Sequence, residues 1–166
     1  MSTENNLKEA FAGESQANRK YLAFAKKADE ENFKQVAKLF RAAANAETVH
    51  ALNHLKVLNG IKSTKENLNE SIQGETHEFT EMYPHMIEEA EKEDNALAKI
   101  SFTKANTVEK THASLYKKAL ESINSGKDLE QKEMYVCQIC GHTVEGAPPD
   151  KCPVCMAPKE KFKKIE

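Results

Sequence analysis

Apolar residues recur every three or four positions along most of this chain, which is the spacing of an amphipathic helix. The pattern continues to about Ile123 and is broken only by short turn-like stretches near residues 30–32, 59–60 and 94–95. It predicts four long helices, each with one apolar face. Their expected bounds are residues 3–29, 33–58, 64–92 and 95–123.

The chain changes character after Ile123. A polar stretch begins at Asn124, and all four cysteines follow it as two Cys-x-x-Cys pairs, Cys137 with Cys140 and Cys152 with Cys155. Two such pairs complete a tetrahedral shell of four sulfurs, which suits zinc or iron. A segment this short lies below the roughly 40 residues that a core alone usually stabilises, so we expect the metal to stabilise it. The predicted domains are residues 1–123, a linker over 124–133, and residues 134–166.

Composition narrows the function classes. Charged residues make up 30% of the 166, the net charge is −2, and Lys and Glu are interspersed, which argues against a nucleic-acid partner and a membrane-surface helix. No apolar run approaches the ~20 residues that span a bilayer. We therefore expect a cytoplasmic protein with no nucleic-acid or membrane partner. A reducing compartment favours metal binding over disulfides for the cysteines.

Carboxylates and histidines lie on the apolar faces of the predicted helices. Unpaired carboxylates in a helical core are costly and repel one another, and bound cations would remove that cost. The first helix contributes one such carboxylate, the third contributes two, and the second and fourth each carry a Glu-x-x-His motif. These residues are Glu14, Glu47, His50, Glu75, Glu78, Glu109 and His112.

The spacing of these residues indicates a repeated half-site. In an antiparallel helix hairpin, residues equidistant from the turn lie at the same level, as Glu14 and Glu47 do, and as Glu78 and Glu109 do. The i, i+3 spacing of Glu-x-x-His places both side chains on one helix face, as metal binding inside a bundle requires. Each motif alone is more often a solvated face or a hydrogen-bonded core histidine. Their duplication at matched heights predicts two half-sites and two metal ions.

Several residue runs carry a resemblance to a known family: AFAGESQA at 10–17, GETHEFTEMYP at 74–84, YVCQICG at 135–141 and CPVC at 152–155. Together with the two Glu-x-x-His motifs they closely resemble rubrerythrin, over essentially the whole chain. The resemblance implies a mainly α fold, in which a ferritin-like di-iron four-helix bundle is followed by a small rubredoxin-like domain with an FeS4 centre. It also implies a non-haem di-iron peroxidase of oxidative-stress defence, which reduces hydrogen peroxide to water with electrons relayed through the FeS4 centre from an external donor such as a reductase or a rubredoxin.

The resemblance implies roles for the carboxylates of the di-iron site. Glu47 and Glu109 match bridging ligands, and Glu14 and Glu75 match terminal ligands on opposite irons.

The resemblance also implies roles for the remaining residues of the site. His112 matches a fixed nitrogen ligand, whereas Glu78 and His50 match alternative ligands of the other iron. Tyr21 and Tyr83 match tyrosines that hydrogen-bond the ligand carboxylates.

Two alternatives stand beside this interpretation. A zinc ribbon would share the paired cysteines and be purely structural, although Tyr135, Gly141 and Pro153 favour a rubredoxin-like domain, in which zinc can still substitute for iron. A ferroxidase or iron-handling protein would use the same di-iron ligands with dioxygen. The attached electron-transfer module argues against that function, because a ferroxidase needs no supply of electrons.

The connection between the second and third predicted helices is short. Residues 59–63 reach at most ~17 Å, whereas returning along about 25 residues of helix requires near 37 Å. Either residues 65–73 are unwound to serve as the crossover, or the first helix hairpin pairs with the second hairpin of another subunit. We predict the latter arrangement, a domain-swapped homodimer.

Overall fold

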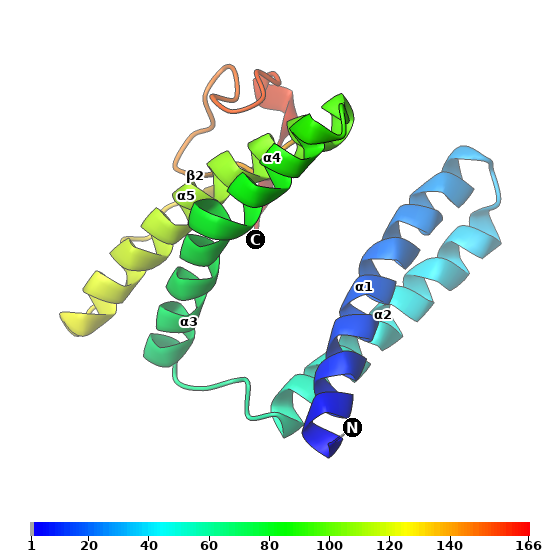
Figure 1. The fold of residues 1–166 in the computed structure, drawn as a ribbon, viewed down its shortest axis with the longest axis horizontal. Helices are drawn as coiled ribbons and strands as arrows, with labels where there is room; N and C mark the ends of the chain where they lie inside the picture. The colour runs from blue at the N-terminus through cyan, green and yellow to red at the C-terminus, as the bar shows by residue number, and fades with distance from the viewer. Residues whose placement is uncertain (1) are drawn as a thin grey trace. The chain divides into compact units, whose positions relative to one another are not determined.

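The structure is a computed structural model that describes residues 2–166. The chain forms two compact units, one ending at Lys62 and the other running from Ser63 to Glu166. Four long helical segments (Figure 1) and a small C-terminal sheet, in a module whose four cysteines cluster, confirm the predicted fold class. The proposed domain boundaries near residues 123 and 133 stay a prediction. Within the described residues, no helix is both long enough and apolar enough to cross a membrane.

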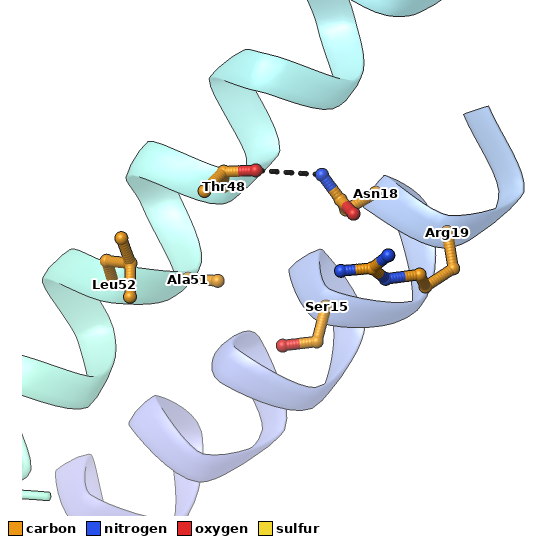
Figure 2. A pocket seen from close by; sticks show the side chains of 6 residues that line it. All are labelled: Ser15, Asn18, Arg19, Thr48, Ala51 and Leu52. Carbon is orange, nitrogen blue, oxygen red and sulfur yellow. Dashed lines mark hydrogen bonds between the residues drawn. The ribbon is translucent and has the colours of Figure 1, made fainter. Parts of the chain in front are cut away.

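The first unit is a hairpin of α1 (Thr3–Glu30) and α2 (Lys34–Val57), which lie side by side (Figure 1). Asn18 fixes their register, because its side-chain amide donates to the Ala44 carbonyl at 2.6 Å and to the Thr48 hydroxyl at 2.8 Å. Figure 2 shows the Asn18–Thr48 bond at the edge of a pocket of about 140 Å³ between the two helices. The pocket lining contains none of the predicted metal ligands, so we treat it as a feature of helix packing.

The packing of this hairpin relies on small side chains. The buried residues of α1 and α2 are all alanines: Ala25, Ala28, Ala37, Ala44 and Ala51. Larger apolar side chains of the same two helices stay exposed, among them Leu39 at 67%. The fully buried positions of the two helices are therefore all small, which lets the helices approach closely.

The second unit begins with a longer helical hairpin. Its first arm is α3 (Thr64–His77), a π-helical turn η1 (Glu78–Met82) and α4 (Tyr83–Lys92), and its second arm is α5 (Ala96–Asn124). Within this unit, α3, η1 and α4 all pack against α5.

The cysteine module completes the second unit. Strands β1 (Met134–Cys137), β2 (Thr143–Glu145) and β3 (Phe162–Ile165) form an antiparallel sheet in the order β2-β1-β3, and a short 3-10 helix, η2 (Lys159–Lys161), precedes β3. Met134 pairs with Glu145 on one side and with Ile165 on the other. Strand β2 contacts α5, so the module lies against the second hairpin of its own unit.

Three helices end at the positions where the sequence predicts turns. Asn32, Asn59 and Asp94 follow α1, α2 and α4 and adopt positive φ angles of 64°, 53° and 52°. Asn and Asp tolerate this left-handed conformation better than other non-glycine residues. At the end of α1, the N–H of Phe33, the residue after Asn32, donates to the carbonyl of Ala28 and completes a Schellman motif. The equivalent hydrogen bond closes the ends of α2 and α4.

The third predicted helix is interrupted, which the apolar pattern does not show. Pro84 has no N–H for the carbonyl four residues earlier, and its ring clashes with that turn of a regular helix. The structure accommodates Pro84 with the wider turn η1, in which the Tyr83 N–H bonds to the Glu78 carbonyl five residues back. Single π turns of this kind are frequent at functional sites.

The structure contradicts an unwound crossover after α2. Residues 65–73 all lie in α3, which begins with a complete capping box: the Ser63 side chain accepts from the Glu66 N–H while the Glu66 side chain accepts from the Ser63 N–H. Only residues 58–63 connect α2 to α3. Of the two arrangements that the short connection allowed, the one that required unwinding is therefore wrong.

Candidate metal centres

The first hairpin brings three predicted ligands together. Glu14 lies on α1, and Glu47 and His50 lie one turn apart on α2. The Nδ1 atom of His50 is 2.8 Å from Oε2 of Glu47 and 3.9 Å from Oε1 of Glu14. The three side chains each offer one ligand atom within 4.8 Å of the others, which is close enough to share one cation.

The second hairpin repeats this arrangement. Glu75 lies on α3, and Glu109 and His112 lie on α5. The Nδ1 atom of His112 is 2.8 Å from Oε2 of Glu109 and 3.8 Å from Oε2 of Glu75, and the three form a second group of possible ligands. The two half-sites thus share the same geometry, as the matched spacing predicts. The assignment of individual ligand roles stays a prediction.

The π turn places two further predicted residues near the second half-site. Burial and the nearby Glu109 carboxylate raise the pKa of Glu78, although Glu78 lies outside the group formed by Glu75, Glu109 and His112. Burial and the same carboxylate also raise the pKa of the Tyr83 phenol, which follows the π turn. Glu78 and Tyr83 therefore border the half-site, where an alternative ligand and a hydrogen-bond donor to a carboxylate are expected to lie.

Tyr21, which is predicted to be the counterpart of Tyr83 at the first half-site, lies in an aromatic cluster. Its ring centroid is 6.3 Å from that of Phe24 and 6.2 Å from that of Phe40. These contacts explain its position through packing. Its predicted hydrogen bond to a ligand carboxylate stays untested.

The charges of the second half-site call for a cation. Burial, together with a hydrogen bond and charge repulsion from Glu109, raises the pKa of Glu75 to about 7. Carboxylate oxygens and an imidazole nitrogen that converge in this way form a donor set for a divalent transition metal, including iron. The residues present therefore fit a metal ion, which would replace the proton that these carboxylates otherwise share.

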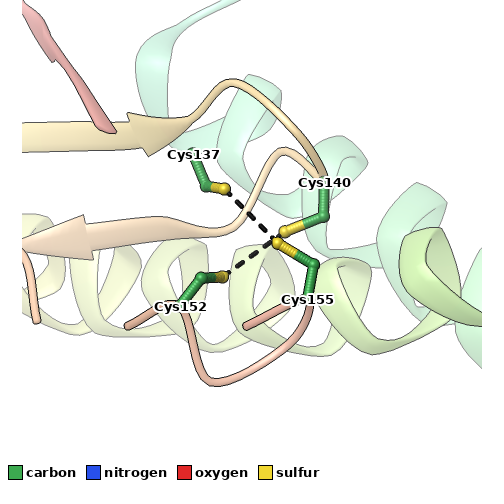
Figure 3. Close-up of side chains that lie close together, drawn as sticks. All are labelled: Cys137, Cys140, Cys152 and Cys155. Carbon is green, nitrogen blue, oxygen red and sulfur yellow. Dashed lines mark hydrogen bonds between the residues drawn. The ribbon is translucent and has the colours of Figure 1, made fainter. Parts of the chain in front are cut away.

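The four cysteines converge at one point (Figure 3). The Sγ atoms of Cys137 and Cys155 are 3.7 Å apart, and those of Cys140 and Cys152 are 3.6 Å apart. Disulfide sulfurs would be only about 2.05 Å apart. A metal held about 2.3 Å from four sulfurs at the corners of a tetrahedron keeps those sulfurs about 3.8 Å apart. The geometry thus fits a tetrahedral metal site.

Backbone amides point at the sulfurs of this cluster. Burial opposes ionisation of Cys137, but hydrogen bonds from the backbone of Ile139 and Cys140 outweigh it and lower the pKa of this thiol. Burial raises the pKa of the Cys140 and Cys155 thiols, and hydrogen bonds from the backbone of His142 and Ala157 partly offset that rise. Such donors stabilise thiolates, which is the form that binds a metal.

The structure also reveals contacts that the sequence patterns do not indicate. Nε2 of His112 lies 3.0 Å from the Thr143 hydroxyl on β2, and Lys118 on α5 pairs with Glu145 at the end of the same strand. Neither Thr143 nor Glu145 belongs to a metal-binding motif. Only the folded chain brings them to the histidine of the second half-site.

The shifted pKa of Glu75 predicts a pH dependence for the metal-free protein. The unfolded chain holds this carboxyl at its ordinary pKa of 4.5 and the folded protein at about 7, so the folded state binds an extra proton between these values. The free energy of unfolding should therefore fall as the pH rises from about 4.5 to about 7. Urea denaturation in the presence of a chelator measures this, and Glu75→Gln should flatten the dependence. The exposed substitution Glu9→Gln is the control and should keep the wild-type pH dependence. The prediction is contradicted if the free energy of unfolding of Glu75→Gln depends on pH as steeply as that of the control.

Comparison with known proteins agrees with this pair of sites. The sequence model of the rubrerythrin family matches residues 5–120, and that of the rubrerythrin rubredoxin-like domain matches residues 135–163. Rubrerythrin-2 of Clostridium acetobutylicum is 33% identical, covering 96% of this chain and 95% of the relative. Nigerythrin of Nitratidesulfovibrio vulgaris is 37% identical, covering 97% of this chain and 85% of the relative.

Solved structures give the same result. A structure of nigerythrin in a mixed-valence state matches 99% of this chain and 87% of its own, with 34% identity and a TM-score of 0.57. The fully reduced, all-ferrous state of nigerythrin gives 35% identity and a TM-score of 0.58. Rubrerythrins carry a di-iron site and a rubredoxin-like iron site with four cysteine ligands, which match the carboxylate–histidine groups and the cysteine cluster described above. The chain belongs to the rubrerythrin family of oxidoreductases.

Proposed function

We propose that this protein is a non-haem di-iron peroxidase, which reduces hydrogen peroxide to two molecules of water with two electrons and two protons. The observation that carries the proposal is the contact between a carboxylate half-site and the cysteine module: Nε2 of His112 hydrogen-bonds Thr143, three residues from Cys140. A module able to carry electrons, placed against a redox-capable site, favours a reaction that consumes electrons. We assign the protein to oxidative-stress defence in the cytoplasm.

The carboxylates and histidines would hold the irons and position the substrate. Glu47 and Glu109 are proposed to bridge the two irons, with Glu14 and Glu75 as terminal ligands and His112 as a fixed ligand. When bound, iron at this site would supply the electrons that cleave the O–O bond, and iron at the four-cysteine site would pass electrons on one at a time.

Residues beside the site would control ligands and protons. Glu78 and His50 are proposed as alternative ligands of one iron. The Tyr83 phenol lies near the Glu109 carboxylate, and the raised pKa of Tyr83 keeps its O–H protonated. That O–H can donate a hydrogen bond to a ligand carboxylate and hold it in place. Tyr21 is proposed to do the same at the other half-site.

Assembly of the complete site requires both hairpins, and we propose that they come from two chains. Only residues 58–63 connect α2 to α3, and α3 is helical from Thr64 onward, which leaves no crossover segment. The first hairpin buries only alanines and leaves apolar side chains such as Phe33 and Leu39 exposed, 58% and 67% respectively. A second copy of the chain could cover that surface and complete the site in a domain-swapped homodimer.

The peroxidase assignment predicts a preference between two oxidants. The iron-loaded protein, reduced chemically and mixed with either oxidant in a stopped-flow instrument, should be oxidised faster by hydrogen peroxide than by dioxygen at equal concentration. A reaction that is at least as fast with dioxygen would instead favour a ferroxidase.

The proposed relay predicts a selective effect of Cys137→Ser. This change removes one of the four sulfurs from the cysteine cluster. Turnover of peroxide with reduced rubredoxin as the external donor should fall to background. A single oxidation of the chemically pre-reduced di-iron site should keep its wild-type rate, because the carboxylate ligands are intact. Equal loss of both reactions would contradict a separate relay role for the cluster.

The swapped dimer predicts complementation between two defective chains. One chain carries Glu14→Gln and Glu47→Gln, and the other carries Glu75→Gln and Glu109→Gln. In a swapped heterodimer one bundle collects all four substitutions and the other collects none. Random pairing after co-expression should therefore restore about a quarter of the wild-type number of di-iron sites, measured as iron bound at these sites per chain.

A matched control uses two chains defective in the same half-site. Co-expression of Glu14→Gln with Glu47→Gln places a substitution in every bundle of a swapped dimer, so it should restore no intact site. If opposite-half variants also restore none while each still forms dimers, both hairpins of a site come from one chain and the swap is wrong.

A further inference from the structure

The Thr143 hydroxyl connects the second half-site to the cysteine cluster. Thr143 begins strand β2, and its Oγ1 lies 3.0 Å from Nε2 of His112 on α5. The same oxygen lies 3.2 Å from the carbonyl oxygen of Gly141, to which the hydroxyl donates. Gly141 directly follows Cys140, a member of the four-sulfur cluster. One hydroxyl group thus links the imidazole to the backbone of a cysteine turn.

The Thr143 hydroxyl constrains the proton on His112. A threonine hydroxyl has one proton, and when Thr143 donates it to Gly141 its oxygen can only accept from the imidazole. Nε2 of His112 then carries a hydrogen, and in the neutral ring, which is the form that binds a cation, Nδ1 carries a lone pair.

Nδ1 of His112 points toward the half-site, where it hydrogen-bonds a carboxylate through a proton or would bind a cation through its lone pair. Nδ1 of His112 is 2.8 Å from Oε2 of Glu109 and 3.8 Å from Oε2 of Glu75. The Thr143 bond to the opposite side of the ring holds this orientation, since turning the ring over would replace each of the two nitrogens with a ring carbon and lose both contacts. The ring is thereby set to offer nitrogen to a cation that the carboxylates also bind.

Thr143 is the hydrogen-bond partner of Nε2 in this structure. A cavity of about 370 Å³ borders both His112 and Thr143, and its lining is mostly apolar, including Leu68, Leu115 and Leu129, with Tyr116 and Glu145 as further polar members. Loss of the hydroxyl removes this hydrogen bond, which is costly for a partly buried donor.

A second contact holds the strand in place. Lys118, further along α5 than His112, pairs with Glu145, two residues after Thr143. Because this ion pair is partly exposed, we expect it to contribute modestly. Its presence allows the position of the strand to be perturbed separately from the Thr143 hydrogen bond.

We propose that Thr143 is a positioning residue for His112: it selects the Nε2–H tautomer, directs Nδ1 into the half-site and so ties the cysteine module to the half-site of its own chain. The inference rests on the proposed function only in taking His112 as a metal ligand.

The test uses zinc as a diamagnetic probe in the full-length protein, so that it does not depend on peroxidase activity. Thr143→Val removes the hydroxyl at nearly constant shape, and Thr143→Ser retains it. The readouts are the ¹⁵N chemical shifts of the His112 ring and the zinc affinity of the carboxylate–histidine site, measured by chelator competition. Partners of metal-binding histidines typically contribute 10–100-fold to affinity, so Thr143→Val should weaken zinc binding about tenfold or more.

Conservative and control variants separate positioning from general packing. Thr143→Ser should restore both the single-tautomer ¹⁵N pattern and the affinity. Thr107→Val, an exposed change on α5 where the hydroxyl donates only to the Thr103 carbonyl, should leave both readouts at wild type. Lys118→Met should alter them less than Thr143→Val does.

Two outcomes would overturn the inference. One is a Thr143→Val protein with wild-type ring shifts and zinc affinity. The other is a Lys118→Met effect equal to that of Thr143→Val, because loss of strand contact alone would then explain both. Neither outcome bears on the reaction with peroxide, which can fail or succeed independently.

Discussion

Repulsion among carboxylates is the constraint on which this structure depends. Each hairpin carries Glu side chains on the face where a helical bundle needs apolar contact, and in the second hairpin burial and the neighbouring Glu109 carboxylate raise the pKa of Glu75 to about 7. Ionised carboxylates at such distances are stable only when a cation or a proton lies among them. The helix spacing places a histidine beside these carboxylates in each half-site. A proton or a metal ion among them offsets the cost of burying them together.

Much of this arrangement could be predicted from the sequence, because helical geometry is regular. Residues equidistant from a turn lie at one level, so helix spacing alone is enough to place Glu14 with Glu47 and His50. The ends of α1, α2 and α4 were also predictable, since Asn and Asp mark a left-handed helix end. Each of these inferences uses only local spacing and residue type.

The remaining features depend on tertiary contact and have weak local signals. The π turn follows from Pro84, but an internal proline can equally kink or end a helix. Thr143 carries no motif, and its hydroxyl becomes meaningful only because β2 lies on α5 beside His112. Likewise, the short link between the hairpins excludes a crossover only once α3 is known to be helical from its first residue. Sequence patterns identify the ligands better than the groups that orient them.

The alanines between α1 and α2 have a consequence for metal selectivity. Because Ala25, Ala37 and Ala44 are among the fully buried side chains of α1 and α2, methyl groups help to set the distance between the helix axes. Ala44 lies one turn before Glu47, and its carbonyl accepts the Asn18 amide. The distance from Glu14 to Glu47 and His50 on α2 therefore depends on alanine, the smallest chiral residue. A larger side chain at this interface would widen the half-site and change the ionic radius that it accepts.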